Sequence, residues 1–119
     1  MSTSEKFFRA LDELARTAEV VIDRRARTAH PLIPQAIYPL DYGHLNGTMS
    51  GDGDGIDVFV GTATQVGVVG VLLTADAKKR DAEIKLLLNC TASEIEQART
   101  FVSDVLGIGG HLVIRGFTA

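Results

Sequence analysis

The stretch Asp52-Gly53-Asp54-Gly55-Ile56-Asp57-Val58 places three carboxylates within seven residues, separated mainly by glycines. Two like charges about 4 Å apart repel by roughly 4 kcal/mol at an effective dielectric constant near 20. A folded chain therefore rarely keeps such a cluster unless cations neutralise it. Because carboxylate oxygens without clustered Cys or His suit hard ions, the pattern favours Mg²⁺ or Mn²⁺ over Zn²⁺.

The same stretch also has a structural interpretation. Asp-Gly pairs form turns, so a loop rich in Asp and Gly can simply join two strands. An EF-hand is excluded, because Ile56 and Asp57 stand where that loop requires an oxygen ligand and a glycine. Spacing alone leaves the metal site and the plain turn open.

Asp57 is the most unusual of the three acids, since it lies inside an apolar run that predicts a strand over 56–60. Period-2 alternation puts Asp57 on the same face as Gly55 and Phe59. An unpaired buried charge is costly, so its neighbours in the fold should include a cation. Asp76 and Asp81 form a second acidic pair after the next strand, which can also be a solvated turn whose charges balance.

The remaining pattern predicts two helices among several short strands. Apolar spacings of three and four predict a helix over 4–18, capped by Ser4, and a capping box at Thr91–Glu94 opens a second helix that Gly107 ends. In that second helix, Val105 is expected to complete the apolar core face. Further strands are expected at 20–23, 37–45, 67–73, 83–88 and 111–117. Short polar turns between strands favour an antiparallel barrel or a strongly curved sheet with flanking helices.

Length, composition and net charge limit the possible functions. A chain of 119 residues is expected to form one domain, 1–119, and 45% hydrophobic residues are typical of a globular protein. The net charge of −3 gives no electrostatic case for nucleic acid or an anionic membrane as partner. A lone Cys90 excludes an internal disulfide, and neither a signal peptide nor a membrane-length apolar run is present, so we expect a cytoplasmic protein.

Two motifs together resemble a known family. The stretch Tyr38-Pro39-Leu40-Asp41-Tyr42-Gly43-His44-Leu45-Asn46-Gly47-Thr48 precedes the acidic stretch 52–58. This arrangement is similar to the soluble inorganic pyrophosphatases of family I, which show Tyr-Pro-x-x-Tyr-Gly, a short turn, and then Asp-x-Asp-Pro-hydrophobic-Asp. The order, the spacing and the later Gly70-Val71-Leu72 run agree, and the resemblance spans 20–88.

The resemblance implies an α+β fold, with a closed or partly open five-stranded barrel of the OB type between N- and C-terminal helices. It implies Mg²⁺-dependent hydrolysis of pyrophosphate to two phosphates, and a homo-oligomer. By motif, Asp52, Asp57 and Asp81 would hold a first metal, and Asp57 would bridge to a second. Asp76 would hold a further metal, and Asp23 would contact metal through water. Asp54 would accept a proton from the attacking water, and Tyr42 would bind near the nucleophile or a phosphate.

The chain also departs from the family pattern. The segment between Asp23 and Tyr38 is short, His30 stands where an arginine is expected, and Glu83 stands where a lysine is expected. Three arginines could replace the lost cations, Arg24 first and then Arg25 and Arg27, because arginine suits bidentate phosphate contacts.

Two other strand residues, Lys85 and Arg115, could face either side of the sheet. These departures from the family pattern leave open the alternative that the protein is a non-catalytic relative that binds metal or a small phosphate ligand. They also leave open a hydrolase acting on a phosphate ester or nucleotide.

Overall fold

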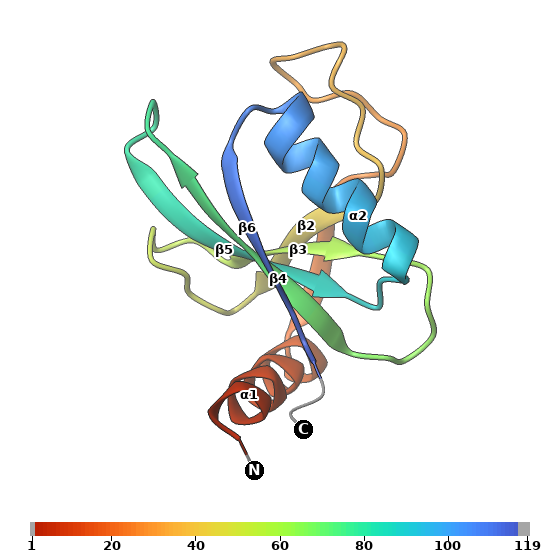
Figure 1. The fold of residues 1–119 in the computed structure, drawn as a ribbon, viewed down its shortest axis with the longest axis vertical. Helices are drawn as coiled ribbons and strands as arrows, with labels where there is room; N and C mark the ends of the chain where they lie inside the picture. Colours follow the sequence, from red (N-terminus) through yellow and green to blue (C-terminus); the bar gives the residue numbers. More distant parts are fainter. Residues whose placement is uncertain (1, 117–119) are drawn as a thin grey trace.

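The chain, described by a computed structural model over residues 2–116, folds as a helix, five strands, a second helix and a last strand (Figure 1). Helix α1 spans Thr3–Thr17, and helix α2 spans Ala92–Thr100 and continues into one π-helical turn, η1, at Phe101–Val105. The strands are β1 (Glu19–Arg24), β2 (Asp41–Asn46), β3 (Ile56–Val60), β4 (Val68–Asp76), β5 (Asp81–Leu88) and β6 (Gly109–Ile114).

All six strands form one mixed sheet in the order β1-β2-β3-β5-β4-β6. Strand β3 runs parallel to β5, and the other neighbours are antiparallel. The α+β class is therefore confirmed, but the expected five-stranded barrel is wrong in strand number. β6 returns after α2 to pair with β4, and within residues 2–116 no ladder joins β6 to β1 to close the sheet.

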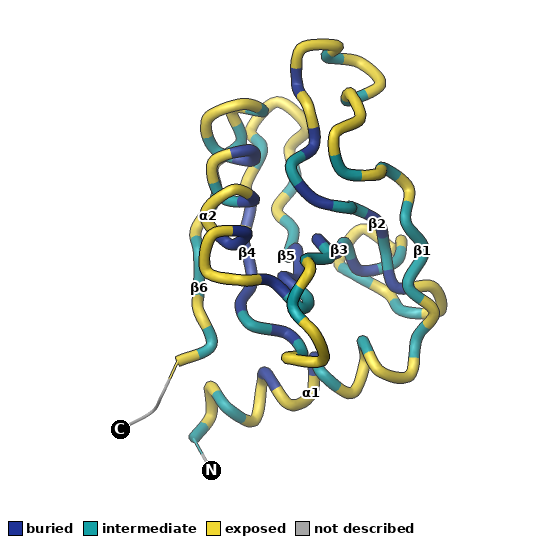
Figure 2. Tube along the Cα trace, turned by 90° about the vertical axis from the view of Figure 1, so that its right-hand side faces the viewer, coloured by how far each residue is buried: buried dark blue, intermediate teal, exposed yellow. Residues whose placement is uncertain are grey.

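Side chains alternate between two apolar clusters, one on each face of the sheet. Phe59, Leu72 and Leu87 pack with the buried side of α2, whereas Val58, Val71 and Leu86 pack with Phe8 and Leu11 of α1. Figure 2 shows the two helices on opposite sides of the strands, with α1 below and α2 beside β4 and β6.

Local signals explain the helix ends. The Ser2 side chain caps α1 by accepting from the Glu5 N–H at 3.1 Å, so the cap expected at Ser4 is wrong by two positions. The capping box of α2 is confirmed, with Thr91 and Glu94 each bonding to the other's backbone. The expected core position of Val105 is wrong, because its side chain is 48% exposed after the π-helical turn shifts the helix face.

A carboxylate outside the sheet fastens the β3–β4 connection to this helix. Glu94 is 8% exposed and accepts from the Thr62 N–H at 3.0 Å and from the Thr62 hydroxyl at 2.9 Å. Burial opposes the charge of Glu94, but the hydrogen bonds from Thr91 and Thr62 outweigh it and lower its pKa. Glu94 is thus a structural carboxylate.

A bulge interrupts β1 at Asp23. The β1–β2 register shifts between Ile22 and Arg24. At this crossing a Cβ on Gly43 would lie 1.8 Å from the Val21 carbonyl oxygen, so only glycine lets the two backbones approach. The extra residue of such a bulge turns its side chain relative to the ladder.

An ion network ties the end of β6 to α1. The Arg115 guanidinium donates to Glu5 Oε1 and Asp12 Oδ2, each at 2.8 Å, and lies 5.7 Å from the Phe8 ring centre. Hydrogen bonds to Glu5 and Asp12 raise the pKa of Arg115, which keeps its charge. This network joins segments 110 residues apart in the sequence.

Three sequence expectations concern isolated features. Cys90 is buried as expected, and burial, followed by the nearby Glu94, raises the pKa of its thiol to about 12. Of the helices in the described part of the chain, neither is long and apolar enough to cross a membrane. The expected strand residue Phe117 lies outside the described residues.

Candidate functional site

The register of three strands brings polar side chains together on the α2 face. His44 of β2 lies opposite Asp57 of β3, and Asp57 lies opposite Lys85 of β5. Tyr42 lies two residues from His44 and packs its ring against Phe59, with centroids 4.7 Å apart. Phe59 lies opposite Tyr42, and Asp57 lies opposite His44, two residues further along β2. This register confirms the expectation that Asp57 and Phe59 share a face of the sheet.

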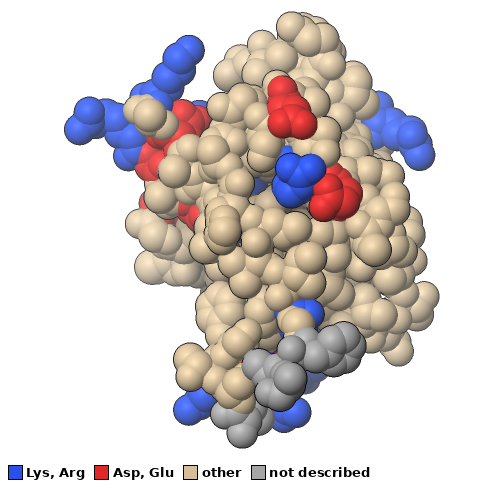
Figure 3. All heavy atoms as spheres, in the orientation of Figure 1, with Lys and Arg blue, Asp and Glu red and all other residues tan. Residues whose placement is uncertain are grey.

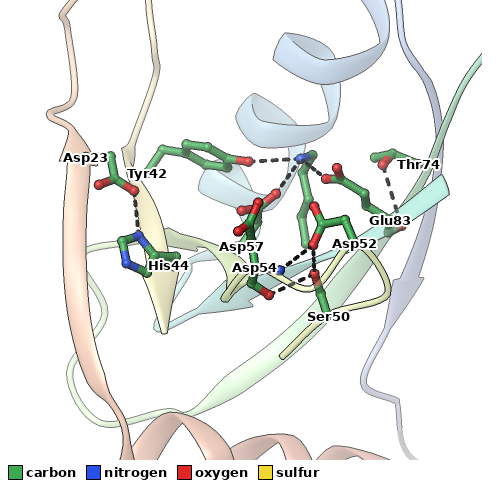
Figure 4. Close-up of polar contacts among 10 residues, drawn as sticks. Asp23, Tyr42, His44, Ser50, Asp52, Asp54, Asp57, Thr74 and Glu83 are labelled. Carbon is green, nitrogen blue, oxygen red and sulfur yellow. Dashed lines mark hydrogen bonds and ion pairs between the residues drawn. The ribbon is translucent and has the colours of Figure 1, made fainter. Parts of the chain in front are cut away.

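The ammonium of Lys85 is the centre of this polar group. Its Nζ donates to Tyr42 Oη at 2.9 Å, to Asp57 Oδ2 at 3.0 Å and to Glu83 Oε2 at 3.2 Å, drawn as dashed lines in Figure 4. Lys85 is 8% exposed, so its charge is largely removed from water. The cation that Asp57 requires is therefore a residue of the chain itself.

The pKa values of this group follow from burial and charge. Burial opposes the charge of Lys85, but the neighbouring Tyr42 and Asp57 outweigh it and raise the pKa of the ammonium. Burial also raises the pKa of Tyr42, which stays a neutral phenol at pH 7, and raises the pKa of Glu83, which lies beside Asp57. Two carboxylates thus share one positive charge.

The other two acids of the sequence motif lie in the loop before β3. Asp52 accepts from the Ser50 hydroxyl at 2.5 Å and from the Asp54 N–H at 2.9 Å, and these hydrogen bonds lower its pKa (Figure 4). Asp52 therefore stabilises its own loop. By contrast, the Asp54 carboxylate has no hydrogen bond or ion pair within residues 2–116, although its backbone carbonyl accepts from Ser50.

Asp54 and Asp57 line one hollow of about 260 Å³, together with Asp23, His44 and Gly55. Asp23 Oδ2 lies 2.8 Å from His44 Nδ1, as Figure 4 shows, so His44 is a polar residue of this hollow. Three of the acids predicted for the site therefore meet in one place. They come from the β1 bulge, the loop before β3 and β3 itself.

A second hollow of about 330 Å³ adjoins the first at Asp23 and is lined by Arg24, His30, Pro31, Tyr38 and Tyr42. The rings of His30 and Tyr38 stack with centroids 6.1 Å apart. Burial raises the pKa of Tyr38, and the positive charge of Arg24 opposes that rise. Arg25 instead pairs with Asp41 at 3.5 Å, so among the three arginines Arg24 is the one that lines this hollow.

The second acidic pair lies elsewhere on the sheet. Asp76 and Asp81 face each other at the end of the β4–β5 hairpin, and Asp76 accepts from the Lys78 and Lys79 N–H groups at 3.1 and 3.2 Å. Asp81 precedes Lys85 by four residues, or about 13 Å along a strand. Figure 3 shows acidic and basic atoms side by side over this hairpin, at the upper left. Asp76 and Asp81 line a hollow of their own.

Mg²⁺ fits these residues in kind, because carboxylates are its preferred protein ligands. Their arrangement in the structure is not that of a metal site, because within residues 2–116 no three His, Cys, Asp or Glu side chains are grouped to hold a metal ion. The position beside Asp57 is taken by the Lys85 ammonium, and Asp52 is bonded within its loop.

The sequence marked Glu83 as a departure from the family pattern and left the face of Lys85 open, but neither residue was predicted as part of the site. A signal was present, because Lys85 interrupts the apolar run Ile84 to Leu88 and a charge inside such a run is costly without a partner. Alternation also puts Lys85 on the face of Leu87, which faces α2. The same argument that singled out Asp57 applies to Lys85.

These observations define the class of domain: a mixed sheet between two helices, with acid-lined hollows on one face. The sequence model of the inorganic pyrophosphatase family matches residues 4–108. The chain therefore belongs to the inorganic pyrophosphatase family. No curated protein matches it at a significant level.

Solved structures agree on the fold. The chain is similar to an inorganic pyrophosphatase from Coxiella burnetii, with 15% identity, a TM-score of 0.58, and coverage of 80% of this chain and 82% of that one. It is similar to the inorganic pyrophosphatase of Helicobacter pylori, with 16% identity, a TM-score of 0.56, and coverage of 80% and 81%. An inorganic phosphatase from Anaplasma phagocytophilum gives 18% identity, a TM-score of 0.56 and the same coverage.

Proposed function

We propose that this protein is an inorganic diphosphatase that hydrolyses pyrophosphate to two phosphates, with Mg²⁺ or Mn²⁺ as its cofactor. The observation that carries the proposal is the meeting of Asp23, Asp54 and Asp57 in one hollow, next to a second hollow lined by Arg24. The first hollow offers carboxylates for a cation, and the second offers a guanidinium for a phosphate anion. Membership of the pyrophosphatase family supports the choice of substrate.

The residues take different parts in this proposal. In the first hollow, Asp23 and Asp57 would hold a metal, which when bound would neutralise the substrate and acidify a water molecule. The other three predicted metal ligands, Asp52, Asp76 and Asp81, do not line this hollow. The unpaired Asp54 carboxylate would orient the attacking water and accept its proton. The neutral Tyr42 hydroxyl would donate to a phosphate oxygen, and Arg24 would bind the phosphate that faces the second hollow.

The test is phosphate release from pyrophosphate, with Mg²⁺ and then with Mn²⁺, by the wild type and by Asp54→Asn. We expect metal-dependent release that falls about 100-fold in Asp54→Asn, since a positioned base contributes on this order. Asp104→Asn is the matched control, because Asp104 is an exposed acid on η1 away from the hollows. No release above the level of Asp54→Asn would reject the proposal.

A second candidate is a non-catalytic relative that binds pyrophosphate or another small phosphate ligand. The observation that favours it is the Lys85–Asp57 contact at 3.0 Å, which occupies a proposed metal ligand with an ammonium. The glutamate at position 83 adds a negative charge beside the same ammonium. Calorimetric titration with pyrophosphate separates the candidates, because binding without any phosphate release would select this one.

Two further parts of the proposal concern the protein in solution. A homo-oligomer and a cytoplasmic location are expected from the resemblance and the composition, and both stay predictions. Light scattering coupled to size-exclusion chromatography tests the first against a monomer mass of 12.7 kDa. A mass equal to that value would reject the oligomer.

A further inference from the structure

The Lys85 ammonium occupies a position that resembles a cation site. Oxygen atoms of Tyr42, Asp57 and Glu83 surround it at 2.9 to 3.2 Å, and they come from β2, β3 and β5. An ammonium has three N–H donors, so these contacts use its whole donor capacity. The chain has thus placed a positive charge of its own against the central carboxylate of the acidic motif.

We propose that Lys85 competes with divalent cations for Asp57 and thereby sets the metal affinity of this chain. The proposal rests on the proposed function, because it takes Asp57 as a metal ligand. It assigns to Lys85 a role in metal affinity and not a contact with the substrate. A divalent ion at Asp57 Oδ2 must either share that oxygen with the Lys85 ammonium or displace the ammonium.

Electrostatics makes the competition strong. A divalent ion that binds Asp57 while Lys85 remains at 3.0 Å would lie close to a positive charge with little water between them. If Lys85 moves away, its ammonium loses Tyr42 and Glu83 as well, and buried donors without partners are costly. Either route weakens metal binding relative to the same carboxylates without the lysine.

The glutamate at position 83 fits this arrangement. Glu83 Oε2 lies 3.2 Å from Lys85 Nζ, and Glu83 and Lys85 are alternate residues on the same face of β5. Two carboxylates around one ammonium leave a net negative charge there when both are ionised. Removal of the lysine charge alone would therefore leave Asp57 and Glu83 as a pair of oxygen donors for a divalent ion.

The experiment is a titration with Mn²⁺ in which free Mn²⁺ is measured by electron paramagnetic resonance. The proteins are the wild type, Lys85→Gln, the double variant Lys85→Gln/Asp57→Asn, and Lys6→Gln as a control. Glutamine keeps a hydrogen-bond donor near Tyr42 but carries no charge. Lys6 is an exposed residue of α1, so its variant loses the same charge away from the site.

We expect the Kd for Mn²⁺ to fall about tenfold or more in Lys85→Gln, to return toward the wild-type value in the double variant, and to stay unchanged in Lys6→Gln. A Kd in Lys85→Gln within about twofold of the wild type would overturn the proposal. A gain that persists in the double variant would also overturn it, because the gain would not involve Asp57. Circular dichroism checks the fold of each variant.

Lys85→Met provides a second uncharged variant of similar length, with the same expected gain, if Lys85→Gln does not fold. Phosphate release by the wild type is measured separately, so the two proposals can fail independently. A wild type that releases no phosphate while Lys85→Gln gains Mn²⁺ affinity through Asp57 would reject the diphosphatase and support the competition. A wild type that releases phosphate while Lys85→Gln gains no affinity would do the reverse.

Discussion

Two networks in this molecule are built alike, each from one cation between two carboxylates and one aromatic ring. Lys85 lies between Asp57 and Glu83 and 5.4 Å from the Tyr42 ring centre. Arg115 lies between Glu5 and Asp12 on the other side of the sheet, where it joins α1 to the end of β6. Both cations are shielded from water, at 11% and 21% side-chain exposure.

The difference between them lies in their surroundings. The Arg115 network lies between two packed elements, and its hydrogen bonds to Glu5, Asp12 and the Val68 carbonyl fasten a helix to a strand. The Lys85 network borders a hollow that contains Asp54, a carboxylate without a partner in the described residues. A buried ion pair alone therefore does not mark a functional site, whereas an ion pair beside an unpaired acid and an open hollow is a candidate for one.

The largest expected effect separates the two networks by activity. Asp57→Asn should lower phosphate release by about 100-fold or more, because it removes a charge at the centre of the proposed site. Arg115→Gln should leave activity at the wild-type level at a temperature where it is folded. Equal losses in both variants would show that activity only reports folding, and would remove the functional distinction between the networks.

The second prediction concerns stability, for which the Arg115 network is expected to matter. Arg115→Gln should lower the free energy of unfolding by about 1–2 kcal/mol, a value reduced because its partners are partly exposed. Urea denaturation measures this change. Arg99→Gln is the matched control, since the ion pair of Arg99 with Glu96 lies within one exposed helix turn, and it should cause no measurable loss. An Arg115→Gln variant as stable as the wild type would contradict the structural role.

The smallest effect concerns Glu94, a carboxylate of neither network. Its folded-state pKa lies below the ordinary value of 4.5, so the folded chain binds fewer protons than the unfolded chain in that range. The stabilisation is complete above about pH 4.5 and is lost as the pH falls through the folded-state pKa.

Glu94→Gln should therefore cost about 1 kcal/mol at pH 7, and less at pH 3, where the wild type has lost part of the same contribution. Urea midpoints at the two pH values measure it. An equal cost at both values would show that the Glu94 charge contributes nothing to stability.

Much of the fold follows from local sequence. The apolar run Ile56 to Val60 forms β3 with the expected bounds, and the Thr91–Glu94 capping box begins α2. The parallel pairing of β3 with β5 and the addition of β6 as a sixth strand could not be predicted in this way. They depend on contacts between segments far apart in the chain, which no local period encodes.

The site was predictable only in part. Alternation placed Asp57 on the Phe59 face, and the charge of a buried carboxylate required a cation nearby. That Lys85 provides this cation depends on its register opposite Asp57, which is a property of the β3–β5 ladder. The contact of Asp23 with His44 depends on the pairing of β1 with β2, which sequence alone did not indicate.

The most direct test of the account is ³¹P nuclear magnetic resonance of pyrophosphate incubated with the wild-type protein and Mg²⁺. The account predicts that the pyrophosphate signal is replaced by a single phosphate signal, and that this conversion slows markedly with Asp57→Asn. A pyrophosphate signal that persists with folded wild-type protein, with Mg²⁺ and with Mn²⁺, would contradict the diphosphatase.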